Sequence, residues 1–410
     1  MMLKYEKIWS YILFLYLLFL YLFSEQVKIL TTICGLLMLI TILIYKKKIK
    51  ILDTKSLILW CLYLGLGLIP TVLLGYSEIS EAFKFIISII IALPFGIIYL
   101  NKDLQINYIL VLKRLLFIVL FGCFLQILMP HTLESFNKLR MSNVKFGWFY
   151  DFFNSGFIVG FSFQTAITGF YLTILTCIIF IEILYKKYNF LNTVILISAI
   201  IFLFLTGKRI FILLTVLNLM FIYIFYKRVN ILKLIVLLVL LTVLILIFSK
   251  YTIIGQRLVM RFYSQDPTRG RIRIYTFLFK LYKSHPIIGT GLSSTLSLLP
   301  YAYNAHNIYL QILTETGLVG FIILIGYFFN NLYKLFKVSK YFLKIKKNIN
   351  ICAICFSIQF IFLIWGFTGN PLYDIYPFVV YMISVGIVNN MLFEIKRKGR
   401  IKWRKKIRYQ

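Results

Sequence analysis

The sequence predicts an all-α, polytopic membrane protein with about twelve transmembrane helices and one large outer loop between spans 9 and 10. Of the 410 residues, 61% are hydrophobic and only 14% are charged, against roughly 45–50% and 25% in soluble domains. Such a chain has too little polar surface to cover a soluble core, so soluble, disordered and disulfide-scaffold classes are excluded. The second observation is a series of apolar runs, each near the about 20 residues that a helix needs to cross a bilayer.

Twelve such runs follow one another along the chain. They lie near residues 8–24, 28–45, 56–75, 83–100, 107–129, 156–184, 190–206, 209–226, 229–249, 308–333, 351–369 and 374–393. The first run ends at Phe23-Ser24-Glu25 without a small-residue cleavage site, so we predict a retained span. The fifth is the least regular, because Lys113 and Arg114 interrupt it.

The net charge of +32 is interpreted as membrane topology, and we expect no nucleic-acid partner. With both termini placed in the cytoplasm, the predicted inner segments are short and carry most of the lysines and arginines, which also attract anionic lipid. The expected organisation is spans 1–9 within residues 1–249, the large outer loop at 250–307, spans 10–12 within 308–393 and a basic cytoplasmic tail at 394–410.

The large loop contains a helical pattern that follows Gly270 and ends at Ser284-His285-Pro286. Its helical spacing gathers Arg269, Arg273, Thr276, Lys280 and Lys283 into one polar stripe. Arg271 instead shares a face with Tyr275, Leu278 and Tyr282. An arginine on that face either snorkels from the start of the helix or needs an anionic partner.

Polar residues at three further places lie at or near predicted membrane boundaries. Thr206-Gly207-Lys208-Arg209 places two cations at the outer face, where they either snorkel or bind phosphate oxygens. His306 precedes the tenth span and is either structural or a general base. Glu315 lies within that span and is expected to have a cationic or hydrogen-bonding partner.

Metal and cofactor signals are weak. The sequence has no D-x-D pair, no H-E-x-x-H and no P-loop, and the acids predicted outside do not cluster, so we predict neither a metal nor a cofactor. Gly289-Thr290-Gly291 is a candidate anion-binding nest.

The order of these motifs resembles the O-antigen ligase and polymerase family, which includes Wzy-type polymerases and WaaL-type ligases. The motifs are G-R-x-x-x-Y at Gly270–Tyr275, S-H-P-I-I-G-T-G at Ser284–Gly291, H-N-I-Y-L-Q at His306–Gln311 and E-T-G at Glu315–Gly317. T-G-K-R at 206–209 resembles the family's upstream arginine motif, which usually reads S-R, and Tyr275 stands where Trp is commoner. The match covers about residues 206–320.

The resemblance implies a metal-independent, inverting, integral-membrane glycosyltransferase that acts on polyprenyl-pyrophosphate-linked oligosaccharides. Its active site would face the periplasm or exterior of a bacterial inner membrane. Carried over to this chain, Arg209 and Arg271 hold the pyrophosphate and His306 acts near the acceptor hydroxyl. The supporting candidates are Lys208, Tyr275, Asn307, Tyr309 and Glu315. The chemistry agrees, because arginine can stabilise a leaving diphosphate without a metal.

Four functions stay open at this point. The leading hypothesis is a repeat-unit polymerase for O-antigen or capsule, and the runner-up is a ligase that moves finished glycan onto lipid A core or another acceptor. A lipid-linked oligosaccharide transporter and a scaffold protein are the rivals from other classes. Besides the lipid-linked substrate and membrane lipids, the candidate partners are a chain-length regulator or other envelope polysaccharide proteins.

Overall fold

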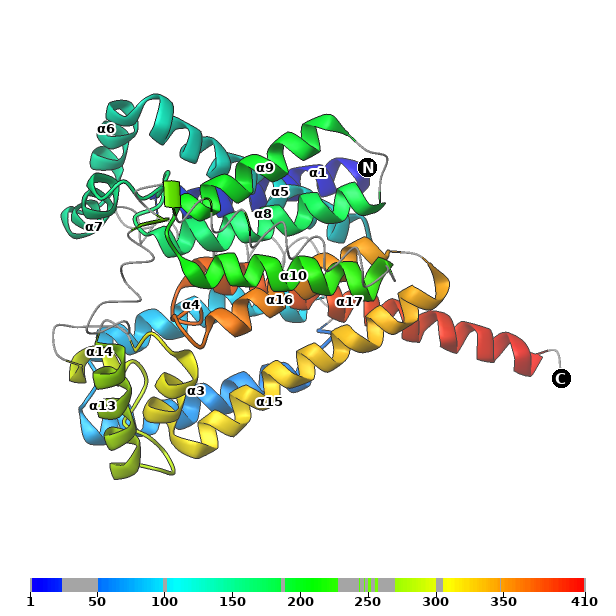
Figure 1. The fold of residues 1–410 in the computed structure, drawn as a ribbon. Helices are drawn as coiled ribbons and strands as arrows, with labels where there is room; N and C mark the ends of the chain where they lie inside the picture. Colours follow the sequence, from blue (N-terminus) through cyan, green and yellow to red (C-terminus); the bar gives the residue numbers. More distant parts are fainter. Residues whose placement is uncertain are drawn as a thin grey trace. The chain divides into compact units, whose positions relative to one another are not determined.

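The computed structural model is built from helices. It describes residues 2–23, 51–98, 102–185, 189–227, 270–299, 305–346 and 348–408, with isolated positions between 243 and 256. Every regular element in these ranges is a helix, and Ile51 and Ile98 form an isolated β-bridge (Figure 1). The predicted all-α class is confirmed.

By length and composition, six described helices could each cross a membrane. They are α3 (Thr54–Leu74), α4 (Ile79–Ile97), α5 (Lys102–Leu128), α8 (Thr165–Tyr185), α15 (Ile308–Ile345) and α17 (Ile375–Arg408). Four shorter apolar helical stretches lie in α1 (Met2–Phe23), α9 (Phe190–Leu205), α10 (Arg209–Lys227) and α16 (Ile349–Trp365). The predicted span at 28–45 and most of that at 229–249 lie outside the described residues, so the total of twelve stays a prediction.

The chain divides into two compact units. Unit 1 comprises Met1–Ser10, Thr32–Ile109 and Arg271–Gln410, and unit 2 comprises Tyr11–Thr31 and Leu110–Gly270. Unit 1 therefore contains most of the motif string, whereas the T-G-K-R segment belongs to unit 2.

In unit 1, α3 packs along α15, and α17 packs against both α4 and α16 (Figure 1). Two glycines bring α4 and α17 close together. A Cβ atom on Gly386 would lie 1.9 Å from the Phe95 carbonyl oxygen, and one on Gly96 would lie 2.4 Å from the Met382 side chain. Small residues allow such close backbone approach between apolar helices.

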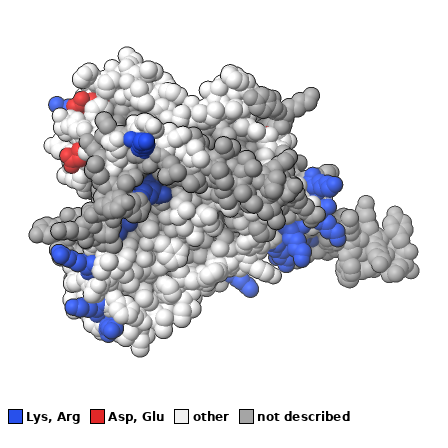
Figure 2. Space-filling model, in the orientation of Figure 1, with Lys and Arg blue, Asp and Glu red and all other residues white. Residues whose placement is uncertain are grey.

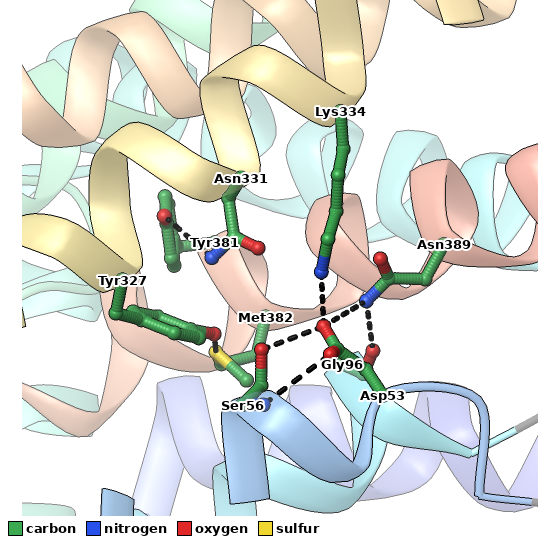
Figure 3. Close-up of polar contacts among 9 residues, drawn as sticks. All are labelled: Asp53, Ser56, Gly96, Tyr327, Asn331, Lys334, Tyr381, Met382 and Asn389. Atoms are coloured by element: carbon green, nitrogen blue, oxygen red, sulfur yellow. Dashed lines mark hydrogen bonds and ion pairs between the residues drawn. The ribbon is translucent and has the colours of Figure 1, made fainter. Parts of the chain in front are cut away.

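A polar network joins four helices of unit 1 (Figure 3). Asp53 caps α3: one carboxylate oxygen accepts from the Ser56 amide at 3.2 Å and the other from the Ser56 hydroxyl at 2.6 Å. Lys334 of α15 forms an ion pair with the Asp53 carboxylate. The Asn389 amide of α17 donates to the Gly96 carbonyl at 2.8 Å and to Asp53 at 3.4 Å.

Lys334 lies at the predicted inner end of the tenth span, which is expected near residue 333. The helix itself continues beyond this point, and α15 ends at Ile345. The ion pair with Asp53 gives the Lys334 ammonium group a partner within unit 1. Exposed cations beyond this point gather near the end of α15 and on α17 (Figure 2): Lys337, Lys340, Lys344, Lys346, Lys396 and Arg397.

In unit 2, α8 packs against α9 and α10. Lys113 of α5 forms a 2.6 Å ion pair with Glu182 of α8, which explains how the irregular fifth run remains helical. Residues 130–155, which separate the runs predicted as spans at 107–129 and 156–184, fold into two helices, α6 (Pro130–Arg140) and α7 (Asn143–Asn154). The sixth run was expected to begin at residue 156, but α8 begins only at Thr165, and residues 157–163 are buried without being helical.

Candidate functional site

Most of the motif string folds into one packed assembly in unit 1. It consists of α13 (Arg271–Ser284), the connector at residues 285–293, α14 (Ser294–Leu298) and the first turns of α15. Leu278, Leu299 and Ala305 form its buried apolar cluster. The predicted helix after Gly270 is confirmed, and the described members of the polar stripe are exposed: Arg273, Thr276, Lys280 and Lys283. Arg269 lies outside the described residues.

Arg271 begins α13 and is half-buried, on the same face as Tyr275 and the fully buried Leu278. No hydrogen bond or ion pair joins Arg271 to another residue in the part of the chain that the structure describes. Burial raises the pKa of the Tyr275 phenol, and the neighbouring Arg271 charge opposes this shift.

His306 is held through its backbone. Its φ of 53° is left-handed, a conformation that histidine adopts more readily than most residues. The Tyr275 hydroxyl donates to the His306 carbonyl at 3.2 Å. On the other side, the Asn307 side chain caps α15 by accepting from the Tyr309 and Leu310 amides, both at 3.0 Å. Tyr275 and Asn307 thus fix the position of the half-buried His306.

Both the hydroxyl group and the ring of Tyr309 contact residues at the end of α16 or just after it. Its hydroxyl donates to the Leu363 carbonyl at 2.6 Å, and its ring lies 4.5 Å from the Phe367 ring. Nearby, the Ile308 amide donates to the Gly366 carbonyl at 2.9 Å. These contacts attach the start of α15 to the end of α16.

The connector is paired with a broken turn of α15. Gly317 interrupts that helix with φ 62° and ψ −167°, and a Cβ there would lie 2.2 Å from the Ile287 carbonyl oxygen. A Cβ on Gly289 would lie 2.4 Å from the Glu315 carbonyl. Both positions require glycine for the same reason: two backbone segments meet in a left-handed conformation.

The predicted anion-binding nest at Gly289-Thr290-Gly291 is wrong. The three amides donate to protein carbonyls: Gly289 to His285 at 3.0 Å, Thr290 to Thr314 at 3.0 Å and Gly291 to Glu315 at 2.8 Å. A nest binds an anion through amides that have no other acceptor. These glycines therefore serve the packing of the connector.

Glu315 is fully buried and accepts hydrogen bonds on both carboxyl oxygens. The Thr295 hydroxyl donates to Oε1 at 2.6 Å and Gln311 donates to the same oxygen at 2.9 Å, while the Tyr373 hydroxyl donates to Oε2 at 2.5 Å. Asn370 donates to Gln311 at 2.8 Å. The expectation of a hydrogen-bonding partner is confirmed, and within the described residues no cation pairs with this carboxyl group.

Sequence reasoning did not select these partners of Glu315. Thr295 and Tyr373 are separated from it by 20 and 58 residues. The general signal was present, because a carboxyl group in an apolar helix needs donors. A single sequence does not indicate which of many Thr and Tyr residues supply them.

Arg209 lies in unit 2, at the first residue of α10. The turn before it is shaped by Thr206, whose hydroxyl donates to the Leu203 carbonyl at 2.7 Å, and by Gly207 with φ 67°. The Lys208 ammonium lies 5.7 Å from the centroid of the Phe152 ring. The predicted convergence of Arg209 with Arg271 and His306 stays a prediction.

Comparison with known proteins agrees with the motifs. Residues 193–325 match the family model Wzy_C, described as O-antigen ligase. This range includes T-G-K-R, α13, the connector and the broken turn of α15. No curated protein matches the chain.

Proposed function

We propose that this membrane protein is a polysaccharide repeat-unit polymerase, and the match of residues 193–325 to the family model described as O-antigen ligase supports this class of enzyme. It transfers glycan from a polyprenyl-pyrophosphate donor to a sugar hydroxyl at the outer leaflet of a bacterial inner membrane, without a metal. The main support is one juxtaposition. Arg271, with no protein hydrogen-bond partner among the described residues, lies one turn before Tyr275, which holds the backbone of His306.

The arginines would bind the diphosphate of the donor. A guanidinium group presents two parallel donors to phosphate oxygens and stabilises the charge that grows as the diphosphate leaves. Arg271 is half-buried, which strengthens such contacts relative to water. Arg209 is at the start of a 19-residue helix, the end whose partial positive charge also favours anions.

His306 would serve as the general base. In the proposed step, the acceptor hydroxyl oxygen bonds to the anomeric carbon while the bond from that carbon to the phosphate oxygen breaks. His306 takes the hydroxyl proton, and the diphosphate leaves with the electron pair. The ordinary pKa of histidine, near neutrality, suits this role.

A ligase is the second candidate, because the matched family is described as O-antigen ligase. A transporter is less favoured. It would be expected to use ionisable groups within its spans, but Lys113 is paired with Glu182, and Glu315 is fixed by three side-chain donors.

The glycan profile of a null strain tests the proposal. A polymerase-null strain should lose long chains while one repeat unit remains attached, whereas a ligase-null strain should lose all attached repeats and accumulate lipid-linked polymer. Complementation with His306→Ala or Arg271→Ala should fail to restore long chains. Arg273→Ala is the matched control, since Arg273 is exposed on the same helix and should restore them. Long chains in the His306→Ala strain, at normal protein level, would refute the role of His306.

Purified protein separates an enzyme from a transporter. In detergent micelles there are no two leaflets, so glycan transfer between a lipid-linked donor and an acceptor requires catalysis by the protein itself. If the correctly folded protein transfers no glycan when it is supplied with its cognate donor and acceptor, the assignment as a glycosyltransferase is contradicted.

A further inference from the structure

Gln126 lies near the end of α5, and both polar atoms of its side chain form hydrogen bonds with one short backbone segment. Its Oε1 accepts from the amides of Val159 and Gly160, both at 2.8 Å, and its Nε2 donates to the Phe157 carbonyl at 2.8 Å. The Gln126 side chain is buried, with 8% of the residue exposed. All three hydrogen bonds go to the backbone of residues 157–160.

That stretch, residues 157–160, is buried and non-helical, and it lies between α7 and α8. Backbone without helical hydrogen bonds is costly in an apolar environment unless side chains satisfy it. Two other side chains assist Gln126: Asn137 donates to the Gly160 carbonyl at 3.2 Å, and Thr168 donates to the Val159 carbonyl at 2.6 Å. Side chains from α5, α6 and α8 thus hold the segment.

The held segment supports the T-G-K-R turn. The Ile158 amide donates to the Leu205 carbonyl at 3.0 Å, immediately before the turn. The Phe157 ring fills the space beside Gly207, where a Cβ would lie 2.3 Å from a ring carbon. Phe157 and Ile158 therefore directly contact the backbone that leads to Lys208 and Arg209.

We infer that Gln126 is a positioning residue for the cationic turn, acting on Arg209 through residues 157–160. This inference rests on the proposed function, in which Arg209 binds the donor diphosphate. Without the Gln126 side chain, two amides and one carbonyl lose these hydrogen bonds and the segment must rearrange. A displacement of about 1 Å in a substrate-positioning group can cost about 100-fold in rate.

The test uses purified full-length variants in detergent and measures inhibition of glycan transfer by geranylgeranyl diphosphate, a lipid diphosphate probe. Gln126→Leu is similar in size but makes none of the three bonds, and it should raise the inhibition constant about 10- to 100-fold. Gln164→Leu is the matched control, because the Gln164 side chain makes no hydrogen bond within the described residues. If the Gln126→Leu protein unfolds at the wild-type temperature and also has the wild-type inhibition constant, the inference is overturned.

A double variant shows whether Gln126 acts through the turn. Adding Gln126→Leu to Arg209→Lys should raise the inhibition constant by no more than about twofold over Arg209→Lys alone, because both changes disturb one interaction. Losses that multiply would place the effect of Gln126 elsewhere and refute the inference. If Arg209→Lys itself behaves as wild type, the proposed role of Arg209 fails and the positioning role fails with it. If only Gln126→Leu behaves as wild type, the proposed function stands.

Gln126→Glu keeps the inference testable if Gln126→Leu does not fold. A neutral Glu side chain offers one acceptor and one O–H donor, like the amide, whereas its carboxylate has no donor for the Phe157 carbonyl. The inhibition constant of Gln126→Glu should therefore rise with pH relative to wild type and approach it on acidification. A pH profile parallel to that of wild type overturns the inference.

Discussion

The ion pair between Asp53 and Lys334 yields a stability prediction whose size follows from burial. The Asp53 side chain is 9% exposed and that of Lys334 is 14% exposed. Removing one partner of a buried ion pair costs about 3–5 kcal/mol, because the other charge is left without compensation. In Lys334→Met, Asp53 keeps its bonds from Ser56 and Asn389 (Figure 3). We therefore expect a loss of about 3 kcal/mol, at the lower end of that range.

The assay is equilibrium unfolding of the purified protein in mixed detergent micelles, monitored by tryptophan fluorescence. The double variant Asp53→Asn with Lys334→Met removes both charges, and it should recover most of the loss. Lys84→Met is the control, because the pair of Lys84 with Glu81 is exposed and should be worth at most about 0.5 kcal/mol. A Lys334→Met protein within about 0.5 kcal/mol of wild type would refute the reasoning. So would a double variant no more stable than the single one.

The same pair predicts a pH dependence. Burial alone would raise the pKa of Asp53, but hydrogen bonds from Lys334 and Ser56 and the Lys334 charge outweigh it, so the pKa lies below its ordinary value. A carboxyl group with a lowered folded-state pKa contributes stability above its unfolded pKa of about 3.9. That contribution is lost as pH falls through the folded pKa. Unfolding measured from pH 7 to pH 3 should show a smaller acid-dependent loss in Lys334→Met than in wild type.

Two further predictions concern the motif assembly, and a third concerns metal ions. Gly317→Ala should destabilise the protein by at least about 1–3 kcal/mol and abolish glycan transfer, because the new side chain would collide with Ile287 and the backbone at this position is left-handed. The control is Gly326→Ala in the same helix, which has open space around it and should be neutral or stabilising in the same unfolding assay. Tyr275→Phe loses the hydrogen bond to His306, worth about 1 kcal/mol, and should lower the transfer rate with little change in unfolding temperature, whereas an unchanged rate would show that this bond does not position His306. Transfer by purified protein should persist in excess EDTA, and full loss that Mg²⁺ restores would contradict a metal-independent reaction.

Local features of the assembly could be predicted from the sequence. The helical period after Gly270 placed Arg271 with Tyr275 and Leu278, and separated it from Arg273 and Lys280, as the structure confirms. This worked because side-chain direction on a helix depends only on nearby positions. The need of Glu315 for hydrogen-bonding partners was predictable for a similar reason, since it follows from placing a carboxyl group in an apolar helix.

Features that depend on remote partners could not be predicted. The ion-pair partner of Lys334 could not be predicted, because Asp53 lies 281 residues away. Residues 157–163 looked like part of a span because they are apolar, yet Gln126 and Asn137 stabilise them in a non-helical form. The hydropathy of residues 157–163 is the same for either structure, and distant polar side chains decide between them.

The motif residues therefore fall into two groups, according to whether their polar groups have partners among the described residues. The connector amides, Asn307 and Glu315 have protein partners, and Gly289 and Gly317 are required by close backbone contacts. Their effect is to fix the start of α15 against α13. Arg271 differs from them, because its guanidinium group has no hydrogen bond within the described residues although it is half-buried. A half-buried cation at a rigidly fixed place is suited to an anionic ligand, so loss of Arg271 should weaken binding of a lipid diphosphate while leaving the fold intact, whereas loss of either glycine should impair both.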